Sequence, residues 1–300
     1  MTALADQLIR ENTDVQFVVD HRGPQLKGQA CYYRIADWCS DLNVVRNNDV
    51  VVVDSYLAER AVYESIRARC HRLVAVDDYD RIDYGAHAVI NPNPSFRNPL
   101  DRDGCRFRGG QEWVLLREGI RGATSKSRHA QTVERVVITV GGSDNNAALP
   151  LLIKLVKDRW THVDVLAGTD QYAEQIKADD LPQKMTVHGF LTAGAMAKLF
   201  CESDFAISAC GQTLHELAFL GVPTVGICVG DDQIPNQLFY SDTGFLGSRI
   251  DCRLTRWLDH VEEAVKELED IHLRKRRSAA GRMLIDGRGP ARFANLLSTL

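Results

Sequence analysis

The stretch from Phe205 to Gln237 constrains the fold of this chain most, because its pattern predicts a strand, a turn, a helix, a second strand and a polar loop in succession. The apolar run at residues 205–207 ends in small and polar residues at 208–213, and Gly221-Val222-Pro223 separates the helical pattern from the next strand. A strand that enters a helix through such a turn leaves backbone N–H groups directed at one point. That point favours a bound phosphate.

The rest of the chain repeats this alternation of strand and helix. Apolar runs predict further strands at residues 15–19, 50–54, 73–76, 88–90, 135–140, 162–168 and 185–190. Such alternation is typical of parallel βαβ units. The sequence therefore predicts an α/β protein with two doubly wound, Rossmann-type domains, an N-terminal one at residues 1–121 and a C-terminal one at 135–300. Residues 122–134 are polar and unpatterned, so we expect them to form the linker.

Composition and missing motifs exclude several classes of protein. The formal charge of −4 gives no reason to expect nucleic acid or an anionic membrane as a partner. The eight cysteines include no Cys-x-x-Cys pair, which argues against a zinc site or a disulfide framework and favours a reducing compartment. No metalloprotease, α/β-hydrolase or P-loop motif occurs. The early charged residues and the lack of a long apolar run lead us to expect a cytoplasmic protein without membrane insertion.

The basic run Arg274-Lys275-Arg276-Arg277 is the local exception to the acidic charge balance. It falls in a late, charge-rich helical pattern. We therefore expect it to form a solvated helix face rather than a binding site for an anionic partner.

A second glycine-led turn follows the predicted strand at 135–140. Gly141-Gly142-Ser143-Asp144 opens a helical pattern, and glycine lets a backbone approach a phosphate closely. Gly-Gly also serves any tight turn between a strand and a helix, so this motif alone leaves both interpretations open. Together with residues 208–213 it gives two such turns at one edge of one predicted sheet, which suits a diphosphate.

Polar residues near strand ends each allow two interpretations. Thr213-Leu214-His215-Glu216 fits the capping box, in which Glu216 folds back onto the helix start. A carboxylate there could instead accept hydrogen bonds from two ribose hydroxyl groups. Gln233, with Asn236 and Gln237, could contact a sugar or base edge or could lie in a surface loop. Asp77-Asp78 could be an acid/base pair, or a helix cap beside a solvated acid.

Taken together, these motifs resemble a known family. The likeness rests on Val51-Val52-Val53-Asp54-Ser55-Tyr56, Val76-Asp77-Asp78, Ile90-Asn91-Pro92-Asn93, Leu115-Leu116-Arg117-Glu118, Val140-Gly141-Gly142-Ser143-Asp144, Ser208-x-x-Gly211-x-x-x-x-Glu216-x-x-x-x-Gly221-x-Pro223 and Asp286-Gly287-Arg288-Gly289. In this order they resemble the PseG-type UDP-sugar hydrolases, relatives of the MurG glycosyltransferases, over nearly the whole chain.

The resemblance implies a GT-B-like fold whose two domains face a cleft, with UDP held by the C-terminal domain. It also implies cleavage of UDP-2,4-diacetamido-2,4,6-trideoxy-β-L-altropyranose by water at the anomeric carbon. The products would be UDP and the free sugar, on the route to pseudaminic acid. No metal or other cofactor is implied.

Carried over residue by residue, the resemblance implies that Glu216 binds the ribose and that Gln233 lies near the sugar or the phosphate. The implied ligands of the diphosphate are Gly142, Ser143, Ser208, Ala209, Gly211, Gln212 and Thr213. The candidate catalytic residues are Tyr56, expected to face the sugar from the N-terminal domain, and Asp232, where the family can carry Asn.

One departure from the family bears on catalysis. The family opens with a strand and a G-x-G-H-x-x-R loop whose His is the proposed base, whereas this chain starts at Met1, where the following helix begins. We therefore expect Met1 to be an internal methionine of a longer product, or the protein to bind a UDP-sugar with poor turnover. A UDP-sugar-dependent glycosyltransferase and a UDP-sugar-binding protein without turnover are the alternative functions, and the sequence does not fix the oligomeric state.

Overall fold

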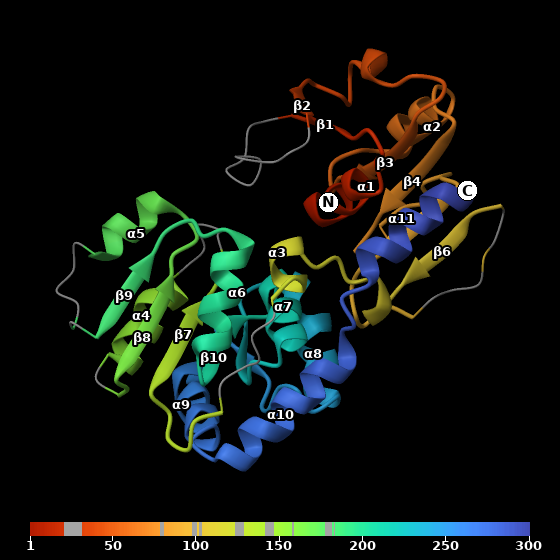
Figure 1. Cartoon of the computed structure of the whole chain (residues 1–300). Coiled ribbons are helices and arrows are strands. Elements are labelled where there is room, and N and C mark those ends of the chain that lie inside the picture. Colours follow the sequence, from red (N-terminus) through yellow and green to blue (C-terminus); the bar gives the residue numbers. More distant parts are fainter. Residues whose placement is uncertain are drawn as a thin grey trace. The chain divides into compact units, whose positions relative to one another are not determined.

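The computed structural model describes residues 1–20, 32–78, 81–97, 101, 104–123, 129–141, 147–157, 159–177, 182 and 184–300. Contacts within this part of the chain define two compact units (Figure 1). Unit 1 comprises Met1–Leu116 and Gly287–Leu300, and unit 2 comprises Arg117–Asp286. Within the described residues, no helix has the length and apolar character needed to cross a membrane.

The sheet of unit 1 has the strand order β3-β4-β5-β6, and neighbouring strands run parallel. These strands are β3 (Val50–Asp54), β4 (Arg72–Val76), β5 (Ala88–Asn91) and β6 (Arg106–Gly109). A separate parallel pair is formed by β1 (Gln16–Val19) and β2 (Tyr32–Ile35). The apolar residues of β4 and β5 are buried, as expected for parallel strands with both faces covered.

Helices cover both faces of the unit 1 sheet. The helical segments of this unit are α1 (Thr2–Arg10), η2 (Leu42–Val44), α2 (Arg60–Arg67), η3 (Gln111–Trp113) and α11 (Gly289–Thr299). Val74 and Val76 pack in a core with α1 and α11, whereas Leu73 and Ala75 pack in a core with α2. Successive side chains of a strand point to opposite faces, which gives each face its own core. Figure 1 shows α11 beside α1, although they come from opposite ends of the chain.

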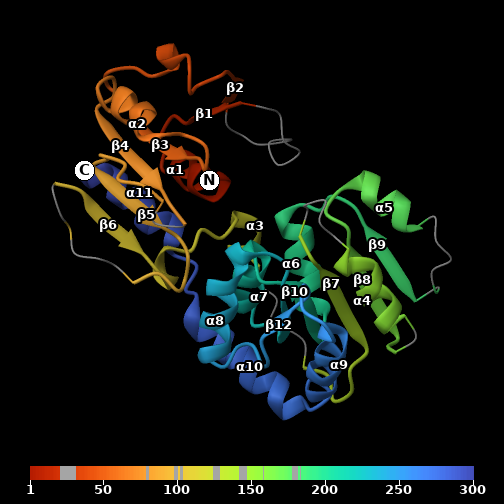
Figure 2. The ribbon, with the colours of Figure 1, turned by 180° about the vertical axis from the view of Figure 1, so that it is seen from behind.

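The sheet of unit 2 has the strand order β12-β11-β10-β7-β8-β9, again with parallel neighbours. Its strands are β7 (Arg135–Thr139), β8 (His162–Leu166), β9 (Met185–His188), β10 (Phe205–Ala209), β11 (Thr224–Cys228) and β12 (Ile250–Asp251), the last labelled in Figure 2. The chain winds outward from β7 through β9, and then outward in the other direction from β10 through β12. This is the doubly wound order 3-2-1-4-5-6, whose direction reverses between β7 and β10.

Alternating side chains also give the unit 2 sheet two covered faces. The helical segments of this unit are α3 (Glu118–Arg121), α4 (Ala148–Val156), α5 (Asp170–Lys177), α6 (Ala193–Glu202), α7 (Gln212–Leu220), η4 (Asp231–Gln233), α8 (Ile234–Asp242), α9 (Trp257–Glu267) and α10 (Ile271–Leu284). Val136 and Ile207 pack in one core with residues of α4, α5 and α9. In addition, α7 packs against α6 and α10.

The boundaries of the two units differ from those expected from the sequence. The last helix, α11, lies in unit 1, because Phe293 is buried in the same core as Leu4. The short helix α3 lies in unit 2, where a Cβ on Gly119 would overlap the backbone of Gly194 in α6. The described part of the expected linker, residues 122–123 and 129–134, also belongs to unit 2.

The expectation of a solvated face holds for only half of the basic run: Lys275 and Arg276 are exposed, whereas the other two arginines are buried. Arg274 is fully buried and Arg277 is 5% exposed. Arg274 donates hydrogen bonds to the backbone carbonyls of Leu268 and Ala130, and Arg277 pairs with Glu267 at 2.9 Å. Buried guanidinium groups need such acceptors. Arg274 thereby ties the segment before β7 to α10.

Gly221 ends α7 in the left-handed conformation, with φ 69°. A Cβ there would overlap the side chains of Arg282 and Ser278 in α10. We expect Gly221→Ala to lower the free energy of unfolding by about 2–3 kcal/mol, measured by urea unfolding. Gly244→Ala is the matched control: Gly244 has φ 80°, but a Cβ there would meet no described heavy atom within 4 Å. Gly244→Ala should lower the free energy of unfolding by about 1 kcal/mol. Equal losses in the two variants would show that overlap with α10 contributes nothing.

Candidate functional site

The reversal point of the unit 2 sheet lies between β7 and β10. These strands are parallel neighbours, with Ser208 opposite Thr139, so the turns after them begin side by side. Gly141, after β7, is exposed and has φ 88°. Gly142 and Ser143, predicted to bind a diphosphate, lie outside the described residues. Doubly wound sheets bind ligands at this point, beyond the carboxyl ends of the strands.

The turn after β10 leaves room beside its backbone. Gly211 is the N-cap of α7 and has an extended conformation, with φ −90° and ψ −154°. A Cβ on Gly211 would meet one described heavy atom within 4 Å, Nε2 of Gln233 at 3.6 Å. Neither backbone strain nor packing against the described residues therefore requires glycine here. The N–H groups of the first helical turn and the positive end of the helix dipole favour an anion at this point.

The residues predicted to hold the diphosphate fall into two groups. Ser208 is fully buried, its Oγ donates to the carbonyl of Ala209 at 2.9 Å, and Ala209 is 5% exposed. Gln212 is exposed and Thr213 is half-buried, both in the first turn of α7. Gly211, Gln212 and Thr213 are thus open to a ligand, whereas the side chains of Ser208 and Ala209 lie in the buried part of β10.

Two side-chain amides hold the backbone of Cys210, which links β10 to the turn. Oε1 of Gln233 accepts hydrogen bonds from Cys210 N at 3.0 Å and from Val229 N at 3.3 Å. Nδ2 of Asn236 donates to the Cys210 carbonyl at 3.0 Å. Gln233 therefore fixes the shape of the turn, and its own Nε2 lies beside Gly211. The sequence marked Gln233 as a candidate ligand but gave no sign of this backbone role.

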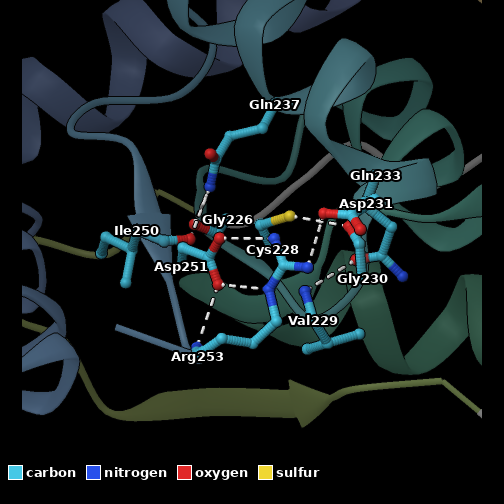
Figure 3. A network of polar contacts seen from close by, with 10 residues as sticks. All are labelled: Gly226, Cys228, Val229, Gly230, Asp231, Gln233, Gln237, Ile250, Asp251 and Arg253. Carbon is cyan, nitrogen blue, oxygen red and sulfur yellow. Dashed lines mark hydrogen bonds and ion pairs between the residues drawn. The ribbon is translucent and has the colours of Figure 1, made fainter. Parts of the chain in front are cut away.

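Figure 3 shows the network around Gln233. Arg253 forms a bidentate pair with Asp251 and also contacts Asp231 at 2.6 Å, which ties η4 to the end of β12. Gln237 donates through Nε2 to the carbonyl of Ile250 at 2.6 Å. These contacts brace the segment that carries Gln233.

The polar residues after β11 do not all lie in a surface loop. Asn236 and Gln237 are 7% and 5% exposed and lie in the first turn of α8. Asp232, a predicted catalytic residue, is exposed in η4. Among the described side chains, no group of three or more His, Cys, Asp or Glu residues is arranged to hold a metal ion.

Glu216 pairs with Arg117 instead of forming the capping box. Because α7 begins at Gln212, Thr213 lies inside the helix and is not its cap. Nε and Nη2 of Arg117 donate to Oε1 and Oε2 of Glu216, each at 2.7 Å. The side chain of Glu216 is 0% exposed and that of Arg117 is 33% exposed. Burial disfavours the charge of Arg117, but the hydrogen bonds and charge of Glu216 outweigh it and raise the pKa of the guanidinium.

In unit 1, Tyr56 contacts Asp78 at the carboxyl ends of β3 and β4. The phenol donates to Oδ2 of Asp78 at 2.8 Å, and Tyr56 is 59% exposed. Burial raises the pKa of the Asp78 carboxyl, the Tyr56 hydrogen bond opposes this, and the charges of Asp54 and Asp77 add to it. Asp77 is buried, and its Oδ2 accepts a hydrogen bond from the backbone N–H of Arg81 at 3.2 Å. Asp77 thus braces the chain after β4, and Asp78 is the partner of Tyr56.

Comparisons with known proteins show similarity to a curated sequence and to several solved structures. No family model matches the sequence. The chain is 26% identical to the uncharacterized protein MJ1062 of Methanocaldococcus jannaschii over 210 residues, which are 62% of this chain and 43% of that protein. It therefore spans less than half the length of this relative.

The similar solved structures include proteins named as sugar transferases and one solved together with UDP. The structure of Acinetobacter baumannii MurG matches with a TM-score of 0.67 and 18% identity over 99% of this chain and 94% of that one. Spinosyn forosaminyltransferase SpnP matches with a TM-score of 0.65 and 17% identity, over 99% of this chain and 95% of SpnP. The S. aureus MnaA–UDP co-structure matches with a TM-score of 0.53 and 13% identity, over 84% of this chain and 74% of the MnaA chain.

These likenesses show the fold. The chain has the α/β architecture of the GT-B glycosyltransferases, with parallel, Rossmann-type sheets, and the predicted fold class is confirmed. At such low identity the likeness places no individual site residue, so the roles of the residues follow from the chemistry of the site itself.

Proposed function

We propose that unit 2 binds the UDP part of a nucleotide sugar beyond the carboxyl ends of β7 and β10, and that the protein hydrolyses the sugar from UDP. The observation that carries this proposal is the N-terminus of α7. It lies at the reversal point of the sheet and is capped by a glycine that neither its conformation nor packing against the described residues requires. A ligand that approaches the backbone closely accounts for that glycine.

Each part of UDP has a proposed ligand in unit 2. The diphosphate lies at the first turn of α7, against Gly211, Gln212 and Thr213. The ribose hydroxyl groups bind Glu216, and Nε2 of Gln233 donates to the sugar or the phosphate. The resemblance to PseG-type hydrolases and the fold likeness to a protein whose structure was solved together with UDP support this assignment.

In the proposed reaction, water attacks the anomeric carbon and releases a proton to the surrounding solvent, and the bond from that carbon to the phosphate oxygen breaks. The electron pair of the broken bond leaves with UDP. The dipole and N–H groups of α7 stabilise the negative charge that develops on the diphosphate. The proposed catalytic residues are Tyr56 in unit 1 and Asp232 in unit 2, and we propose that the reaction takes place in the cytoplasm.

The reaction is tested with UDP-2,4-diacetamido-2,4,6-trideoxy-β-L-altropyranose and no acceptor, with UDP and reducing sugar measured by chromatography. Release of both in equal amounts is the expected result. The fold likeness to MurG and SpnP favours a glycosyltransferase as the second candidate. Turnover only after an acceptor alcohol is added would establish that alternative. UDP binding without turnover under either condition would make the protein a binding protein.

The nucleotide site is tested separately by Gly211→Ala. The extra methyl group fits against Nε2 of Gln233 but occupies the space beside the turn, so UDP should bind about tenfold more weakly while the melting temperature stays unchanged. Calorimetry and thermal unfolding measure the two quantities. Gly194→Ala is the matched control, because a Cβ on Gly194 in α6 would meet no described heavy atom within 4 Å. Full UDP affinity in Gly211→Ala would rule out a diphosphate at this turn.

A further inference from the structure

The carboxylate that should bind the ribose is covered. Both oxygens of Glu216 accept hydrogen bonds from Arg117, and the side chain is 0% exposed. A ribose hydroxyl needs access to one of these oxygens to donate a hydrogen bond. In this arrangement no part of a ligand can reach them.

Arg117 is the part of the pair that can move. Its side chain is 33% exposed, whereas Glu216 is held within α7. The guanidinium also contacts Sδ of Met196 at 3.2 Å, a weak acceptor that binds it loosely. A guanidinium that turns away from Glu216 reaches water and regains hydration, whereas the carboxylate would be left buried and without its counter-charge. The pair therefore opens at low cost only if another donor takes the place of Arg117 at Glu216.

We propose that Arg117 and the ribose hydroxyl groups of the nucleotide compete for the carboxylate of Glu216, so that Arg117 closes the ribose subsite until a ligand displaces it. This inference rests on the proposed function, since it takes Glu216 as the ribose ligand. A vicinal diol supplies two O–H donors, which replace the two N–H donors of Arg117 one for one. Glu216 thus exchanges its hydrogen bonds with Arg117 for hydrogen bonds with the sugar. Because breaking the pair costs free energy, the nucleotide binds more weakly than it would if Arg117 were absent.

Uridine is the probe that isolates this competition, because it carries the ribose diol without the phosphate charge that Arg117 would attract. Arg117→Met removes the competing donors and keeps a side chain of similar length beside Met196. We expect this variant to bind uridine about tenfold more tightly than the wild type, measured by ligand-observed NMR. A gain in affinity on deleting a cation distinguishes competition from a merely structural role, which would lower affinity.

Two controls sharpen the result. With 2′,3′-dideoxyuridine, which lacks both hydroxyl groups, the wild type and Arg117→Met should bind equally. Arg117→Lys keeps the charge but loses the planar fork, so it should bind uridine with an affinity between those of the wild type and Arg117→Met. If Arg117→Met does not fold, the uridine affinity of Arg117→Lys is compared with that of the wild type instead.

The outcomes separate this inference from the proposed function. If the wild type binds UDP but neither variant binds uridine more tightly, Arg117 is not a competitor and this inference alone is overturned. If the gain is the same with dideoxyuridine, the ribose diol is not what Arg117 excludes, and the inference is again overturned. If the wild type binds neither UDP nor uridine, both the nucleotide site and the inference built on it fail.

Discussion

Replacing Glu216 by alanine should weaken UDP binding about 100-fold. The carboxylate is the proposed acceptor for two ribose hydroxyl groups, and hydrogen bonds to a charged group contribute about 1.5–3 kcal/mol each. About 1.4 kcal/mol corresponds to a factor of ten in affinity. Two such bonds contribute about 3–6 kcal/mol, displacement of Arg117 offsets about 1.4 kcal/mol of this, and a net loss of about 100-fold lies within the resulting range. Titration calorimetry with UDP measures it.

Glu216→Ala also removes the partner of a largely buried guanidinium, so stability must be separated from binding. Arg117 is 33% exposed and can recover hydration, which limits the loss of unfolding free energy to about 1–3 kcal/mol. The double variant Arg117→Met/Glu216→Gln removes both charges and should regain most of this stability while UDP affinity stays low. Glu263→Ala, at a side chain 76% exposed on α9, controls for removal of a carboxylate. Unchanged UDP affinity in Glu216→Ala would leave Glu216 as the counter-ion of Arg117 and nothing more.

The strands of the fold could be predicted because their signals are local. The run from Phe205 to Ala209 is mostly apolar and is followed by a glycine-bearing turn, and these features indicate a buried strand. By contrast, β6 (Arg106–Gly109) was not predicted, since two arginines in four residues hide a strand within a polar segment. The start of α8 looked like a loop because its first turn contains Pro235 and polar residues whose side chains are in fact buried. The membership of α11 in unit 1 depends on packing that no local pattern records.

The site was harder to predict because its contacts join distant parts of the chain. Glu216 and Thr213 have the spacing of a capping box, but the helix begins two residues earlier than that motif requires, and the carboxylate pairs with a residue 99 positions away in the sequence. Arg117 was part of a recognised motif, yet spacing alone could not connect it to Glu216. Gln233 was predicted from the sequence as a candidate ligand, but its bonds to the backbone N–H groups of Cys210 and Val229 exist only in the folded chain.

His215 should make the protein less stable in acid. It precedes Glu216 in α7, is 5% exposed, and its Nδ1 lies 2.9 Å from the hydroxyl of Tyr240. Burial lowers the pKa of this imidazole from 6.5 to about 4 and raises the pKa of the Tyr240 hydroxyl, so both groups are neutral in the folded protein.

The sign of the effect follows from proton binding by the two states. Below the unfolded pKa of 6.5, the unfolded chain protonates His215 while the folded protein does not, until the pH approaches about 4. The unfolded state therefore binds more protons in this window, and stability falls as the pH falls through it. A shift of this size at about 1.36 kcal/mol per pKa unit gives a loss of about 3 kcal/mol, which is complete near pH 4 and absent above pH 7.

Urea unfolding of the wild type and of His215→Gln at pH 7.5 and pH 4.5 tests this prediction. Other groups also titrate over this range, so the quantity to compare is the change in unfolding free energy between the two pH values. The glutamine variant should start from a lower stability at pH 7.5 but lose about 2–3 kcal/mol less on acidification than the wild type. His260→Gln, at a side chain 57% exposed on α9, should behave as the wild type does. If the two proteins lose the same stability, the acid sensitivity of the fold lies in its carboxylates and not in the imidazole that α7 buries beside the proposed ribose ligand.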